Sequence, residues 1–104
     1  MEMPKPPPIY EEFVTRFPDL GEAWASLRKA GSTGPLSERE VKLVKLAVAI
    51  GAMREGAVHA SVRKAWAFGV QREDLEQVVA SSASTLGMSG TVAAYTWVKD
   101  ILDK

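Results

Sequence analysis

The segment from Pro35 to Gly69 constrains the fold of this chain more than any other, because it reads as two consecutive helices. After its opening turn, the first of these has only Lys42 and Lys45 as polar residues up to Ile50. So wide an apolar surface predicts a central helix over about residues 38–50 that packs against neighbours on more than one side. A second helix is expected over about 53–68. We expect these two helices to form an antiparallel pair.

Apolar residues recur at helical spacing in the rest of the chain as well. They predict further helices over about 9–17, 19–30, 72–86 and 91–102, separated by segments rich in glycine or proline. No alternating strand pattern and no internal repeat is evident. The sequence therefore predicts an all-α protein of about six helices around a central antiparallel pair. We expect one helical domain over residues 9–104, preceded by a proline-rich arm at residues 1–8.

The charge of the chain excludes some classes of partner. Lys plus Arg equals Asp plus Glu, at 13 each, so the formal net charge is zero. A neutral chain gives no electrostatic reason to expect binding to nucleic acid. Weak charge repulsion fits a protein that associates with itself. We therefore expect a homo-oligomer without a nucleic-acid partner.

The chain contains no cysteine and only one histidine, His59. Disulfides, thiolate nucleophiles and cysteine-based metal sites are therefore excluded, and we expect neither a metal nor a cofactor. No apolar run reaches the roughly 18 residues of a membrane span, so no membrane partner is expected. The first ten residues lack the apolar core of a signal peptide, and the expected location is the cytoplasm.

His59 is the centre of the candidate site. Glu55 precedes it by four residues, and side chains at this spacing lie on the same face of a helix. A carboxylate on one ring nitrogen would fix the tautomer of the imidazole and leave the other nitrogen for proton transfer. Glu40 precedes His59 by nineteen residues, and an antiparallel helix pair would bring it within about 6 Å along the axis. The candidate catalytic residues are therefore His59, Glu55 and Glu40.

Each of these residues also has a structural interpretation. A Glu and a His four residues apart are common on exposed helix faces, where such a pair contributes about 0.3–0.5 kcal/mol. Glu40 fits the third helical position of a capping box that begins at Ser37. The residue types alone leave both interpretations open.

The segment from about residue 36 to 87 resembles the central part of the carboxymuconolactone decarboxylase superfamily, which includes the alkylhydroperoxidase D proteins and is all-helical. The resemblance is carried by Glu40, His59, Ala65, Gly69 and the acidic helix start at 73–75. It implies an alkylhydroperoxidase D-like fold that assembles into trimers or hexamers. It also implies a small-molecule substrate.

Within that superfamily, the peroxidase branch carries a Cys-x-x-Cys dyad at the positions of Ala52 and Glu55 in this chain. Thiol peroxidase chemistry needs a thiolate, so that activity is disfavoured here. The decarboxylase branch resembles this chain more closely, because it tends to have a glutamate four residues before the histidine. Its histidine is thought to move a proton while a lactone carboxylate leaves as CO₂. The resemblance thus implies a histidine-dependent decarboxylase that acts on a small carboxylated lactone or a related acid.

One departure from the decarboxylase pattern keeps a second hypothesis open. Related decarboxylases usually carry a tyrosine shortly before the glycine that ends the fifth helix, whereas this chain has Ser-Thr-Leu before Gly87. The alternative function is a non-catalytic oligomeric scaffold or a small-ligand-binding protein.

Overall fold

The computed structural model describes residues 7–104, and these residues form helices and connecting turns without a strand. The helices are α1 (Pro8–Arg16), α2 (Pro18–Gly31), α3 (Glu38–Gly51), α4 (Glu55–Phe68), α5 (Arg72–Ser81) and α6 (Ala83–Leu102). The predicted all-α class, with about six helices, is confirmed. Most of the predicted proline-rich arm lies outside the described residues, and Pro8, the last residue assigned to it, is the first residue of α1.

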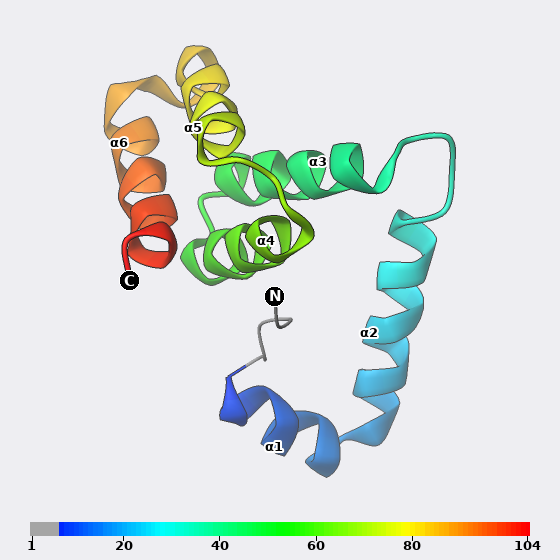
Figure 1. Cartoon of the computed structure of the whole chain (residues 1–104). Helices are drawn as coiled ribbons and strands as arrows, with labels where there is room; N and C mark the ends of the chain where they lie inside the picture. Colours follow the sequence, from blue (N-terminus) through cyan, green and yellow to red (C-terminus); the bar gives the residue numbers. More distant parts are fainter. Residues whose placement is uncertain (1–6) are drawn as a thin grey trace.

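Helices α3 and α4 form the central pair (Figure 1). Helix α3 begins with a complete capping box: the Ser37 hydroxyl accepts a hydrogen bond from the Glu40 amide at 3.0 Å, and the Glu40 carboxylate accepts one from the Ser37 amide at 2.8 Å. Met53, between the two helices, adopts a positive φ of 54°. Helix α4 ends at Gly69, whose φ of 108° is a conformation that glycine adopts without steric cost.

The apolar core lies among helices α3 to α6. Leu46 and Ile50 of α3 are fully buried, as are Val58 and Val62 of α4. The remaining core residues are Ala49 of α3 and six residues from the last three helices and the α4–α5 turn: Ala65, Val70, Leu75, Val79, Ala94 and Val98. Helix α3 contacts α4 on one side and α5 and α6 on another, as its wide apolar surface predicts.

The boundary between α5 and α6 differs from the prediction. The apolar stripe predicts a helix from residue 72 to 86, but α5 ends at Ser81. Near this end the hydroxyls of Ser81 and Ser82 bond the carbonyls of residues 77 and 78, which is the local competition that makes serine a poor helix former. A second break follows inside α6 at Gly87, whose φ of 77° and ψ of 171° are not helical. The break at Gly87 lies where the sequence predicts the end of a helix, whereas the end of α5 at Ser81 was not predicted.

Helices α1 and α2 form an arm that is separate from the other four helices (Figure 1). Neither helix contains a buried residue. The apolar face of α2 is exposed to solvent: Leu20, Trp24 and Leu27 are 51%, 46% and 65% exposed. The radius of gyration, 14.3 Å, exceeds the value of about 13 Å typical of a compact domain of this size. The arm therefore leaves a large apolar surface open to solvent in the single chain.

No helix in residues 7–104 is both long enough and apolar enough to cross a membrane.

Candidate functional site around His59

His59 lies in the second turn of α4, directly after the buried Val58, and its side chain is 22% exposed. Its Nε2 atom lies 3.1 Å from Oδ2 of Asp100 in α6. An ionised carboxylate can only accept hydrogen bonds, so Nε2 is the donor and carries a proton. The other ring nitrogen, Nδ1, is then the atom available for proton transfer. The structure thus places a carboxylate-oriented imidazole where α4 meets α6.

The two glutamates that the sequence predicts for this site lie at the N-terminal ends of α3 and α4. Glu55 is the first residue of α4 and is exposed, and Glu40 is exposed at the start of α3. Within residues 7–104, no hydrogen bond joins His59 to either glutamate. The part of Glu40 and Glu55 in catalysis stays a prediction.

The carboxylate of Glu40 is held by the capping box. Its pKa is lowered from the ordinary value of 4.5, chiefly by the hydrogen bond from the Ser37 backbone amide and then by the Ser37 hydroxyl. Because folding lowers this pKa, the ionised cap stabilises the protein above pH 4.5, and this contribution is lost as the pH falls through the lowered pKa.

Asp100 is the site residue that sequence reasoning missed. It lies 41 residues after His59 in the chain and 46% of its side chain is exposed. Helical spacing relates residues three or four positions apart, so it cannot reveal a pair formed between two different helices. The sequence shows Asp100 only as an acidic residue in the last predicted helix, two positions after Val98, and this does not link it to His59.

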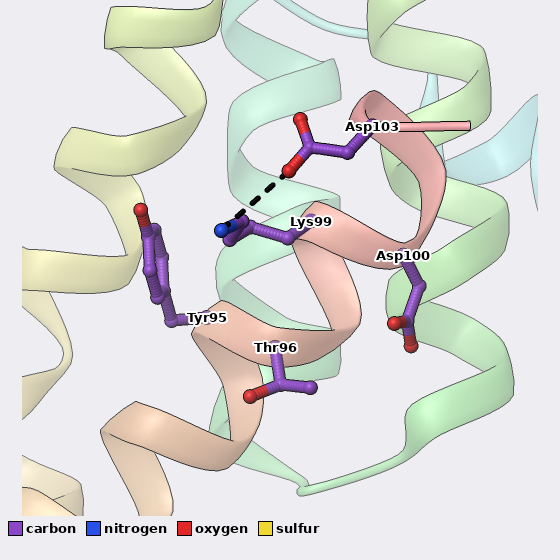
Figure 2. Close-up of a pocket in the computed structure, with 5 residues that line it drawn as sticks. All are labelled: Tyr95, Thr96, Lys99, Asp100 and Asp103. Carbon is purple, nitrogen blue, oxygen red and sulfur yellow. Dashed lines mark ion pairs between the residues drawn. The ribbon is translucent and has the colours of Figure 1, made fainter.

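An open surface depression of about 490 Å³ lies along α6 and includes Asp100. Its lining residues are Tyr95, Thr96, Lys99, Asp100 and Asp103 (Figure 2). Asp100 and Tyr95 project from opposite sides of α6 in this view. Of the pair formed by His59 and Asp100, only Asp100 borders this space.

Ion pairs hold the end of α6 against α5 at one edge of this depression. Asp103 accepts a hydrogen bond from Arg72 of α5 at 2.8 Å and lies 3.6 Å from Nζ of Lys99. The hydrogen bond from Arg72 lowers the pKa of Asp103. Lys99 also lies 5.8 Å from the ring centre of Tyr95. Two aspartates and one lysine line the depression, so its own charge does not favour anions.

No three His, Cys, Asp or Glu side chains gather as a potential metal site in the part of the chain that the structure describes. The chemistry that the pair of His59 and Asp100 supports is proton transfer by an oriented imidazole.

Comparison with known proteins gives one match. A family model described as "Carboxymuconolactone decarboxylase family" matches residues 18–100, which include α2 to α5, most of α6, and both His59 and Asp100. Neither the curated proteins nor the solved structures include a match to this chain.

Proposed function

The chain belongs to the carboxymuconolactone decarboxylase family, and from this premise we propose that it is a lyase that releases CO₂ from a small carboxylated lactone or a related acid. The observation that supports this proposal is the hydrogen bond between His59 and Asp100, which holds the one imidazole of the chain in a fixed orientation. Such a pair orients the imidazole through one ring nitrogen and leaves the other nitrogen for proton transfer. The experiment that tests it is the release of CO₂ from carboxymuconolactone by wild-type protein and by a His59→Ala variant.

The reaction requires one proton. The bond between the carboxylate carbon and the lactone ring breaks, and CO₂ leaves. The electron pair of that bond stays on the ring, where conjugation with the lactone carbonyl spreads its charge. A proton on Nδ1 of His59 is then transferred to the ring carbon, and the imidazole regains a proton from water. Asp100 acts as a positioning residue, because its contact with Nε2 fixes the orientation of the imidazole ring.

Glu40 offers a test of the predicted three-residue site. If Glu40 relays protons to His59, as the nineteen-residue spacing predicts, Glu40→Gln is expected to lower kcat by about tenfold or more. The free energy of unfolding should fall only slightly near neutral pH, because glutamine also closes a capping box but lacks the charge of the ionised carboxylate. Steady-state kinetics and urea denaturation of the same preparation measure the two effects. A kcat equal to that of wild type would limit Glu40 to capping α3.

A thiol-dependent peroxidase is the less favoured activity. The chain has no cysteine, and the two positions where the related peroxidases carry their dyad are Ala52, in the turn after α3, and Glu55, at the start of α4. Peroxide reduction by this route would need a thiolate, which the chain does not supply.

The second candidate function is that of an oligomeric scaffold, and the exposed arm supports it. Within residues 7–104, large apolar side chains on α1 and at the start of α2 are exposed, among them Ile9, Phe13 and Leu20, and exposed apolar surfaces of this kind mark interaction sites. We propose that the arm packs against a second copy of the chain to form a trimer or hexamer. This assembly is compatible with catalysis at His59.

The arm gives a direct test of assembly. Ile9 of α1 is 66% exposed, and Ile9→Asp would place a charge on the proposed interface. We expect light scattering to show a trimer or hexamer for wild type and a smaller species for Ile9→Asp. Thr15→Asp, an exposed position near the other end of α1, is a control for added charge. A wild-type protein that is monomeric at tens of micromolar would contradict the proposal.

A further inference from the structure

A second cavity lies on the other side of α4 from His59. It has a volume of about 400 Å³, within the range of small-molecule sites, and is formed by α2, α3 and α4. We call it the α2–α4 cleft. Its lining residues are Trp24, Leu27, Arg28, Lys42, Lys45, Ala57, Ala60, Ser61 and Lys64.

The cleft is separate from the site around His59. Ala57, Ser61 and Lys64 recur at the helical spacing that defines one face of α4. A helix turns by about 100° per residue, so His59, two residues from Ala57, projects from nearly the opposite face. The helix itself, about 10 Å across, therefore lies between the two sites.

The charged groups of the cleft are all cationic. They are Arg28 of α2, Lys42 and Lys45 of α3, and Lys64 of α4. Within residues 7–104, none of these four forms an ion pair with a carboxylate. The pKa of Lys64 is lowered, first by partial loss of solvent around its ammonium group and then by repulsion from Arg28 and the two other lysines. Three helices thus direct like charges at one space, an arrangement that an anion would relieve.

The other walls of the cleft are apolar. Trp24 and Leu27 of α2 are exposed at its edge, and the small side chains of Ala57 and Ala60 leave the surface of α4 open. An indole ring offers a flat face for stacking, and lysines placed around it suit a carboxylate. Most of the lining surface is contributed by carbon atoms, so an inorganic ion would not fill the space.

We propose that the α2–α4 cleft binds a small organic anion, consisting of a carboxylate on a flat apolar body such as an aromatic ring. The carboxylate lies among Lys42, Lys45 and Lys64, and the apolar body packs against Trp24 and Leu27. This site is independent of the decarboxylase function proposed for His59, because the two lie on opposite faces of α4.

Calorimetric titration of the full chain with 2-naphthoate tests this proposal. We expect saturable binding with one site per chain. The neutral analogue 2-naphthalenemethanol and inorganic phosphate should each bind at least about tenfold more weakly, because each lacks one half of the required chemistry. Equal binding of the alcohol and the carboxylate would overturn the proposal, since the lysines would then contribute nothing.

Variants locate the site. Lys64→Gln is expected to weaken 2-naphthoate binding by roughly fivefold to tenfold, and Lys42→Gln by a similar factor. Lys99→Gln, on α6 and outside the cleft, is the matched control and should leave the affinity unchanged. His59→Ala should also bind 2-naphthoate as wild type does, which separates this proposal from the proposed catalytic function.

Light scattering on the same variants tests whether the cleft binds a small ligand or is an interface with a second copy of the chain. If Lys42→Gln and Lys64→Gln change the oligomeric state and leave 2-naphthoate affinity unaltered, the cleft is a subunit interface and the proposal is wrong. Reduced affinity in both variants at an unchanged oligomeric state would support the anion site.

Discussion

His59→Ala is expected to lower the rate of CO₂ release from carboxymuconolactone by about 10²- to 10⁴-fold, the range typical of a lost general acid or base. The chain contains no other histidine that could replace it. The folded state should be retained, because the imidazole is partly exposed and its one hydrogen bond joins two surface side chains. The measurement is kcat from CO₂ release, with circular dichroism as the check on folding. A variant with wild-type turnover would refute the role of His59.

Asp100→Asn tests the positioning role in the same assay. Asparagine can still accept a hydrogen bond from Nε2, but its amide can also donate, so the imidazole loses a partner that fixes its orientation and protonation. We expect a loss in kcat that is smaller than that of His59→Ala, with KM nearly unchanged. A purely structural role would instead change the free energy of unfolding without this effect on kcat.

Asp103→Asn is the matched control for Asp100→Asn. Asp103 lines the same depression, but it pairs with Arg72 and not with His59. We expect its kcat to stay near that of wild type. A kcat as low as that of Asp100→Asn would show that the charge of the depression, and not the contact with His59, determines the rate.

Leu46→Ala is expected to have the largest effect on stability. Leu46 lies at the centre of α3 with no exposed surface and belongs to the core that joins α3 to α6. Truncation of a buried leucine removes apolar contacts and leaves a cavity, at a cost of about 2–5 kcal/mol. The total stability of such a domain is about 5–15 kcal/mol, so this loss is a large fraction of it. The change in urea midpoint measures the effect.

Val48→Ala, two residues along the same helix, is the control for this truncation. Val48 is 65% exposed, so its removal should change the free energy of unfolding by less than about 0.5 kcal/mol. Equal effects of the two variants would contradict the division of α3 into a buried and an exposed face.

Local sequence signals account for most of the fold of this chain. Ser37 and Glu40 occupy the positions of a capping box, and the structure forms both of its hydrogen bonds. The periodicity of α3 and α4 and the glycine after α4 were sufficient to predict the central pair. The predicted break before Gly87 is present, but the sequence did not predict the earlier end of α5 at Ser81, where the hydroxyls of Ser81 and Ser82 bond backbone carbonyls four residues earlier. Periodicity records which residues are apolar, and it does not weigh these local hydrogen bonds.

The candidate site was only partly accessible to the same reasoning. The sequence points to His59 because it is the one histidine in the chain. Spacing within one helix and across an expected helix pair predicts Glu55 and Glu40 as its partners. The observed partner, Asp100, lies on a helix whose position relative to α4 depends on how the core packs. The α2–α4 cleft is likewise not predictable from local patterns, because its four cations come from three different helices.

The sequence by itself determined the helical class, the cap of α3, the central antiparallel pair, the absence of thiol chemistry and the identity of the one imidazole. These properties depend on residue type and on spacing along one helix, where a rise of about 1.5 Å per residue fixes which side chains are neighbours. The tertiary structure alone decided that Asp100 orients His59, that the lysines of α3 and α4 face Arg28 across a cleft, and that α1 and α2 are left uncovered. Each of these depends on the relative placement of separate helices, which no local pattern records.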